Sequence, residues 1–157
     1  MLIRPYSSPD RDRIRDILEG SETFTTEEVA VALSVIDDAV RCPELEDYTV
    51  FCAESEEGAV VGYICFGPIP MTDRCYDLYW ICVDRSSKKT GIGSLLISRM
   101  ESDLEQRKAR HIYIDTSSSP PYDDARSFYE RHGYRVVSVS PDFYCEGDDK
   151  IVYVKRF

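Results

Sequence analysis

The stretch that decides the fold joins the end of an apolar strand to the start of a helix, and it reads Val83-Asp84-Arg85-Ser86-Ser87-Lys88-Lys89-Thr90-Gly91-Ile92-Gly93-Ser94-Leu95-Leu96. Before it lies the apolar run Asp77 to Val83, which is typical of a strand. After it, Gly91 to Arg107 carries a stripe of apolar residues at helical spacing, namely Ile92, Leu95, Leu96, Met100 and Leu104. The sequence therefore predicts a strand that passes through a short loop directly into an amphipathic helix.

This loop has the chemistry of an anion-binding site. The first N–H groups of a helix lack partners within the helix and carry partial positive charge, so they suit a phosphate. Gly91 and Gly93 remove side chains that would keep an anion from the backbone. Lys88 and Lys89 add positive charge to an otherwise acidic chain. A Gly-x-Gly pair can also serve tight packing of the helix on the sheet, so both uses stay open here.

Two other phosphate-binding loops are excluded by the same residues. A P-loop requires Gly-x-x-x-x-Gly-Lys-Ser/Thr, which the chain lacks. A dinucleotide fingerprint requires a third glycine at position 96, where the chain has leucine.

Outward from this segment, strands and helices follow one another without a linker or an internal repeat. We expect strands at residues 2–6, 48–54, 59–66, 77–83, 111–115, 135–139 and 151–155. We expect helices that begin near Ser8-Pro9, Thr25, Gly91 and Asp123, and an acidic loop over Ser140 to Lys150. The order β-α-α-β-β-β-α-β-α-β-β predicts a mixed α/β fold in a single domain spanning residues 1–157.

The composition narrows the partners. The formal net charge is −10, so the surface repels nucleic acid and anionic lipid, and neither is an expected partner. Such a charge favours a cationic substrate such as an amine, although it also serves plain solubility. No stretch approaches the roughly 20 apolar residues of a membrane span, and the chain does not begin with an apolar signal segment. We therefore expect a cytoplasmic protein.

The six cysteines predict free thiols rather than a disulfide framework. They form no Cys-x-x-Cys pair, and most lie in apolar strand-like runs. This pattern fits a reducing compartment, and no His/Cys/carboxylate cluster has the spacing of metal ligands, so no metal is expected.

Three segments together resemble the GNAT superfamily of acyl-CoA-dependent N-acyltransferases. Lys88-Lys89-Thr90-Gly91-Ile92-Gly93 resembles its Arg/Gln-x-x-Gly-x-Gly/Ala signature, with lysine at the first position. Asp77 to Val83 resembles its fourth strand, and Ala125 to Tyr134 resembles its A-x-x-F-Y-x-x-x-G-F/Y helix and turn. The resemblance covers nearly the whole chain and implies a central, mostly antiparallel mixed sheet flanked by helices.

The resemblance also implies acetyl-CoA as cosubstrate and a set of residues that contact it. Backbone groups of the fourth strand would hold the pantetheine arm, and the loop would hold the phosphates. The implied contacts are Ile81, Cys82, Val83, Lys88, Lys89, Thr90, Gly91, Ile92, Gly93, Ser94 and Tyr129. Tyr122 stands where many members carry a cofactor-binding asparagine, which puts that one contact in doubt.

Two side chains are candidates for proton transfer by the same resemblance. Tyr129 matches the tyrosine that protonates the leaving thiolate, and a phenol is protonated at neutral pH. It could also simply pack the helix on the sheet. Asp77 stands where some members carry a carboxylate base on the fourth strand, but an unperturbed aspartate is a poor base unless burial raises its pKa or water relays the proton. By alternation, Asp77, Tyr79, Ile81 and Val83 share one strand face unless a bulge intervenes.

The acceptor is expected to be a primary amine of a small molecule that attacks the thioester directly, rather than through an acylated Cys82. Family loops imply that its pocket is formed by Gly20 to Thr25 and Ser140 to Lys150. The expected substrate contacts are Phe24, Tyr79, Phe143 and Tyr144. A protein or peptide N-acetyltransferase and a non-catalytic CoA-binding sensor remain alternatives, and a homodimer is possible because sheet edges pair readily.

Overall fold

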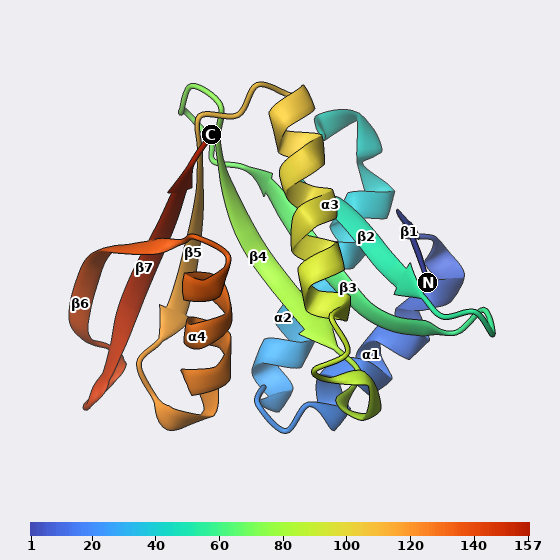
Figure 1. Ribbon diagram of the computed structural model, residues 1–157, viewed down its shortest axis with the longest axis horizontal. Helices are drawn as coiled ribbons and strands as arrows, with labels where there is room; N and C mark the ends of the chain where they lie inside the picture. Colours follow the sequence, from blue (N-terminus) through green and yellow to red (C-terminus); the bar gives the residue numbers. More distant parts are fainter.

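A computed structural model describes all 157 residues and places them around one seven-stranded sheet (Figure 1). The strands are β1 (Leu2–Pro5), β2 (Thr49–Glu54), β3 (Val60–Pro68), β4 (Cys75–Val83), β5 (His111–Ser117), β6 (Arg135–Cys145) and β7 (Asp148–Arg156). The helices are α1 (Arg11–Gly20), α2 (Thr26–Arg41), α3 (Ile92–Gln106) and α4 (Asp123–Arg131). The expected order of elements is confirmed.

The sheet has the order β1-β2-β3-β4-β5-β7-β6, and only the β4–β5 pair is parallel. Helices α1 and α2 cover one face, and α3 and α4 lie on the other (Figure 1). No helix is long and apolar enough to cross a membrane. The expected mixed, mostly antiparallel sheet flanked by helices is thus confirmed.

Each face of the sheet has its own apolar core. Ile14, Ile17 and Ile36 of α1 and α2 pack over Cys52 and Tyr63 on one face. On the other face, α3 buries Ile92, Leu96, Ile97, Met100 and Leu104. Leu95 was expected in this stripe but is 47% exposed, because the packed residues keep to a narrower strip of the helix.

The helix starts follow their capping residues. Helix α2 begins with a capping box, in which Thr25 Oγ1 accepts from Glu28 N (3.2 Å) and Glu28 Oε2 accepts from Thr25 N (2.7 Å). At the first helix the cap lies one residue earlier than expected. Ser7 takes this position because the Asp10 carboxylate reaches back to Ser7 N (2.8 Å), and a 3₁₀ turn over Ser8–Asp10 then leads into α1.

Strands β4 and β5 separate soon after they meet. They pair only where Cys75–Asp77 face His111–Tyr113, whereas β4 continues to Val83 and β5 to Ser117. In Figure 1 the two strands diverge below this contact, with α4 beside β5. The backbone edge of β4 beyond Asp77 therefore has no strand partner on that side.

A β-bulge interrupts β4 within this free stretch. Cys65 pairs with Trp80 and Phe66 pairs with Leu78, which leaves Tyr79 as an extra residue. The bulge shifts the alternation of side chains. As a result Tyr79 and Trp80 both pack toward α1 and α2, while Ile81 and Val83 pack toward α3.

The prediction that four residues of β4 share one strand face is wrong. Asp77, Tyr79, Ile81 and Val83 do not share one face, because the extra residue reverses the parity after Tyr79.

The acidic segment before the last strand also differs from expectation. Ser140 to Lys150 is a hairpin of β6 and β7 rather than a loop, with Cys145 paired to Asp148 across a tight turn. Gly147 has a φ of 82°, which glycine adopts readily. A register shift between Ser140 and Cys145 marks an irregularity that the alternation of residues alone does not reveal.

Candidate active site

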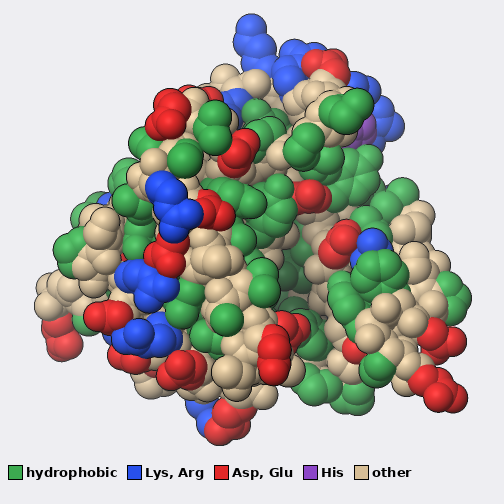
Figure 2. All heavy atoms as spheres, turned by 180° about the vertical axis from the view of Figure 1, so that it is seen from behind, with side chains coloured by type: hydrophobic (Ala, Val, Ile, Leu, Met, Phe, Trp, Pro, Cys, Tyr) green, Lys and Arg blue, Asp and Glu red, His purple; other side chains and the backbone are tan.

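A cleft of about 780 Å³ opens where β4 and β5 separate. It is lined by residues from the α1–α2 loop, β4, the loop before α3, β5, α4 and the β6–β7 hairpin. Viewed from the α1–α2 side, the hollow has apolar walls with acidic side chains at its margin (Figure 2). Most of the candidate residues from the sequence meet here.

The start of α3 forms one end of this cleft. Gly91 has a φ of 88° and caps the helix in a left-handed conformation, so its glycine is required by the backbone. Gly93 has a different reason, since a Cβ there would lie 3.2 Å from the Phe128 ring. The backbone turn therefore requires glycine at position 91, and close packing against α4 requires it at position 93.

Positive side chains accompany the helix start. Lys88 and Lys89 line the cleft, as do Gly91, Gly93 and Ser94. Thr90 does not line it, and its hydroxyl instead donates to Ser87 O (2.6 Å) within the loop. Free amides, a helix dipole and two lysines make this end suited to a diphosphate group.

The loop before α3 is tied to α1 by an ion pair. Arg13 Nη2 donates to Asp84 Oδ2 (2.5 Å), and Arg13 Nε donates to Val60 O (3.0 Å). The other oxygen of Asp84 accepts from Ser86 N (2.9 Å), which closes a 3₁₀ turn. These hydrogen bonds, led by those from Ser86, hold the pKa of Asp84 below its usual range. The carboxylate thus fixes the loop in its ionised form.

A hydrogen-bond chain joins the helix start to the end of α4. His132 Nδ1 lies 2.8 Å from Phe128 O, and its Nε2 lies 3.0 Å from Ser94 Oγ. Because a carbonyl oxygen only accepts, Nδ1 carries a proton, and Nε2 shares a hydrogen bond with the Ser94 hydroxyl. This contact fixes α4 against the first turn of α3.

The free edge of β4 forms the floor of the cleft, to which Ile81, Cys82 and Val83 all contribute. Cys82 is buried, and burial raises the pKa of its thiol to about 11. A thiol with this pKa stays protonated at neutral pH and is a weak nucleophile. The edge therefore offers backbone N–H and C=O groups rather than a reactive sulfur.

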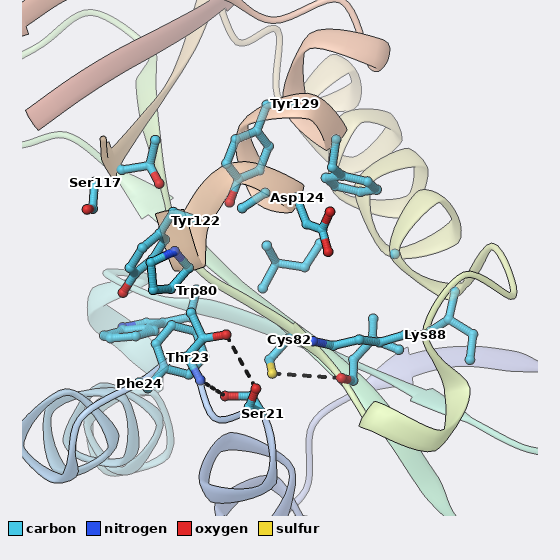
Figure 3. A pocket seen from close by; sticks show the side chains of 18 of the residues that line it. Ser21, Thr23, Phe24, Trp80, Cys82, Lys88, Ser117, Tyr122, Asp124 and Tyr129 are labelled. Carbon is cyan, nitrogen blue, oxygen red and sulfur yellow. Dashed lines mark hydrogen bonds between the residues drawn. The ribbon is translucent and has the colours of Figure 1, made fainter. Parts of the chain in front are cut away.

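Tyr129 of α4 projects into the middle of the cleft (Figure 3). It is only 7% exposed, and its hydroxyl makes no hydrogen bond to another protein group. Burial raises the pKa of Tyr129 well above its usual value, so the phenol keeps its proton over the whole neutral range. Its ring packs against Phe128 and Tyr153, which hold it in place.

Asp77 lies at the point where β4 and β5 part, and it is not among the residues that line the cleft. The pKa of Asp77 is raised to about 6, mainly by burial and in smaller part by the nearby Asp115 carboxylate. The positive charge of Lys150 acts in the opposite direction and lowers the pKa. An aspartate with this pKa is ionised at neutral pH yet is a stronger base than an exposed one.

The far end of the cleft is aromatic and acidic. Phe24 and Trp80 meet edge to face with ring centroids 5.4 Å apart, and Tyr122 lies on the same side in Figure 3, away from Lys88. Tyr122 Oη donates to Glu28 Oε1 (3.1 Å), which joins the segment before α4 to the start of α2. This contact spans the cleft.

Of the residues expected to bind the acceptor, three line the cleft and one does not. Phe24, Tyr79 and Tyr144 line it. Phe143 is 55% exposed and packs instead against Lys150, whose Nζ lies 4.2 Å from its ring centroid. The Phe143 ring also meets the Tyr144 ring edge to face, with centroids 5.1 Å apart, so it lies behind Tyr144 relative to the lining of the cleft.

Among the lining residues that the sequence did not assign to the site are Glu28, Trp80 and Ser117. Asp148 lies in the segment Ser140 to Lys150, which was expected to form part of the acceptor pocket. Ser117 Oγ donates to Asp148 Oδ1 (2.5 Å), a contact between β5 and β7 that no sequence spacing indicates.

The comparisons with known proteins identify this combination of a splayed sheet and a helix start at one end of a cleft. Residues 11–134 match the acetyltransferase (GNAT) family, and the chain belongs to this family. It is an N-acetyltransferase by class, and the sequence resemblance is confirmed.

Three similar proteins illustrate this relationship. An uncharacterized N-acetyltransferase of Methanocaldococcus jannaschii is 27% identical over 99% of this chain and 92% of its own length. The crystal structure of a GNAT-family protein from Desulfovibrio desulfuricans has a TM-score of 0.94 and 32% identity, and the match covers 99% of this chain and 98% of that one. An aminoglycoside 6′-N-acetyltransferase complexed with coenzyme A shares the fold, with a TM-score of 0.77, 19% identity and coverage of 99% and 97%.

Proposed function

We propose that this chain transfers an acetyl group from acetyl-CoA to a primary amine of a small molecule. The proposal is carried by the arrangement of a single cleft. A lysine-rich helix start lies at one end, aromatic and acidic side chains lie at the other, and the free edge of β4 and the Tyr129 hydroxyl lie between them. An anionic cosubstrate and a cationic acceptor would therefore meet beside the phenol.

The cosubstrate would be held mainly by backbone groups. The amides of Ile92, Gly93 and Ser94 suit its diphosphate, and Lys88 and Lys89 add charge. The unpaired edge at Ile81, Cys82 and Val83 can hydrogen bond to the amide-rich pantetheine arm as an added strand would. The coenzyme A complex of the aminoglycoside enzyme, which has this fold, supports the assignment of the cosubstrate.

The chemical step would use groups that line the cleft and one carboxylate beside it. The neutral amine attacks the thioester carbonyl and forms the C–N bond, and a backbone N–H of β4 near the bulge stabilises the oxyanion. The C–S bond then breaks, and Tyr129 donates its proton to the departing thiolate. The proton lost by the amine passes through water to Asp77, because that carboxylate lies outside the lining of the cleft.

Two alternatives to a small-molecule N-acetyltransferase are an enzyme that acetylates peptides and a protein that binds CoA without catalysing a reaction. A peptide N-acetyltransferase needs an open groove, whereas the Tyr122–Glu28 hydrogen bond crosses the acceptor end of this cleft and favours a small molecule. A CoA-binding sensor would not need an unpartnered phenol aimed at the cleft, which favours an enzyme.

The direct test is the release of free thiol from acetyl-CoA by the purified protein in the presence of amines, amino acids and N-terminal peptides. We expect turnover with small primary amines. Turnover only with peptides would establish the first alternative, and tight CoA binding without turnover would establish the second. Absence of CoA binding by calorimetry would contradict the assignment of the α3 start.

A further inference from the structure

The acceptor end of the cleft contains two carboxylates that have no positive partner. Glu28 accepts hydrogen bonds from Tyr122 Oη (3.1 Å) and Thr25 N (2.7 Å), and Asp148 accepts one from Ser117 Oγ (2.5 Å). Neither forms an ion pair with a lysine or arginine of the chain, although both are partly buried and both line the cleft.

Several other partly buried carboxylates have a cation close by: Asp10 pairs with Arg4 (2.7 Å), Asp37 with Arg11 (2.6 Å) and Glu101 with Lys155 (2.8 Å). Asp77 and Asp149 also form no ion pair, but neither lines the cleft. In the cleft itself, Asp115 pairs with Lys150 (3.4 Å). Because partly buried charge is costly without a counter-charge, Glu28 and Asp148 are suited to a cation that arrives with the ligand.

The Glu28 and Asp148 carboxylates both act electrostatically on the same two tyrosines of the cleft. Burial raises the pKa of Tyr122, and Glu28 and then Asp148 add to the effect. Burial likewise raises the pKa of Tyr144, with further contributions from Asp115, Asp148 and Glu28. Both phenols therefore lie within the field of both carboxylates, and with Phe24 and Trp80 they form walls that suit an alkyl chain or a cation.

A second polar group shows where the reacting end of the ligand must lie. The Tyr129 side chain is only 7% exposed, and its hydroxyl, which has no hydrogen-bond partner in the protein, is aimed into the same cleft. The reacting amine must be neutral to attack, and a carboxylate beside it would hold it in the charged form. Glu28 and Asp148 are therefore poorly suited to the reacting nitrogen and well suited to a second nitrogen that stays protonated.

We propose that the acceptor is an aliphatic diamine or oligoamine, whose distal ammonium group binds between Glu28 and Asp148 while its other nitrogen is acetylated. This inference rests on the proposed N-acetyltransferase function and specifies its substrate class. Tyr122 and Tyr144 act as specificity-determining residues that cover the alkyl chain.

The test compares matched amines that differ only in the second nitrogen: putrescine with butylamine, and cadaverine with pentylamine. Acetyl-CoA-dependent thiol release is followed at saturating acetyl-CoA. In at least one pair we expect kcat/KM for the diamine to exceed that for the monoamine by about tenfold or more, as a charge-assisted contact provides. Equal values in both pairs would overturn the inference, whereas no turnover with any amine would instead contradict the proposed function.

Variants then locate the distal site. Glu28→Gln keeps a residue that can complete the capping box, and Asp148→Asn keeps a hydrogen-bond acceptor for Ser117. Each should lower kcat/KM for the diamine about tenfold and leave the monoamine unchanged. Glu146→Gln is the control, because this exposed turn residue does not line the cleft. Equal losses for diamine and monoamine would show that the two carboxylates are only structural and would overturn the assignment.

Discussion

At the scale of single residues, the proposed acetyl transfer depends most on the buried phenol of Tyr129. Tyr129→Phe removes the proton donor for the thiolate and keeps the ring packing against Phe128 and Tyr153. We expect kcat to fall by about 10²-fold or more with little change in the KM for acetyl-CoA. Steady-state kinetics measure this split.

Tyr153→Phe is the matched control for that variant. Tyr153 packs on Tyr129, but its hydroxyl donates to Glu130 (2.9 Å) and it does not line the cleft. If Tyr129→Phe retained full turnover, the phenol would have only a packing role.

The raised pKa of Asp77 leads to a prediction for the pH dependence of kcat. Burial and Asp115 raise its pKa to about 6, so the carboxylate is protonated and inactive as a base below that pH and ionised above it. We expect kcat to rise as the pH increases through about 6. Asp77→Asn should remove this limb, and Asp115→Asn should shift it to lower pH by removing a like charge. A profile that Asp77→Asn leaves unchanged would exclude Asp77 as the base.

Single residues also show the limits of the sequence. The spacing around Gly91 and Gly93 correctly indicated a helix start that faces a cleft, because local chain geometry determines it. The pairs Tyr122–Glu28 and Ser117–Asp148 join segments far apart in the chain, and no local pattern encodes such contacts.

At the scale of elements, the loop before α3 is held by the ion pair between Arg13 and Asp84 (2.5 Å). Asp84→Asn keeps a side chain that can cap the turn at Ser86 but loses the charge that attracts Arg13. We expect the KM for acetyl-CoA to rise several-fold, to about tenfold, with kcat nearly unchanged, because the loop would be less well ordered before binding.

Asp12→Asn is the control, since Asp12 pairs with Arg15 on the exposed side of the same helix. A loss of kcat without a change in KM in Asp84→Asn would contradict the positioning role of the loop.

The strands show why element-level prediction was only partly successful. The apolar runs predicted every strand, because burial of a sheet imposes that pattern. The bulge at Tyr79 and the irregular β6–β7 pairing were not predicted, since both depend on the register of a partner strand. These departures shape the cleft, so the geometry of the site required the structure.

At the scale of the whole molecule, stability near neutral pH depends on buried carboxylates paired with arginine. Asp10 is 7% exposed and accepts from Arg4 at 2.7 and 2.9 Å, which lowers its pKa from 3.8 to about 2. A lowered pKa in the folded state adds stability above pH ~4 that is lost as the pH falls toward 2. This shift corresponds to about 2 kcal/mol of unfolding free energy.

We expect Asp10→Asn to lower the unfolding free energy at pH 7 by at least this amount, because it also leaves Arg4 with only Glu54. The dependence of stability on pH between about 4 and 2 should become shallower. Urea unfolding at several pH values measures both effects, and the exposed Asp12→Asn serves as the control. An unchanged pH dependence would show that Asp10 is not a significant source of acid sensitivity.

The whole molecule also separates its charges within one cleft. The net charge is −10, yet Lys88 and Lys89 line the cleft beside the start of α3, whereas Glu28 and Asp148 line it beside Tyr122 and Ser117, from which they accept hydrogen bonds. Charge separation of this kind orients an anionic donor and a cationic acceptor so that they meet at Tyr129.

The most direct measurement follows the acetyl group itself. Purified protein is mixed with isotopically labelled acetyl-CoA and a diamine, quenched within a single turnover, and both the amine and the intact protein are analysed by mass spectrometry. We predict one labelled acetyl group on the amine for each CoA released and none on the protein. Label on Cys82 before it appears on the amine would contradict direct transfer, and label on neither the amine nor the protein would contradict the proposed function of the cleft.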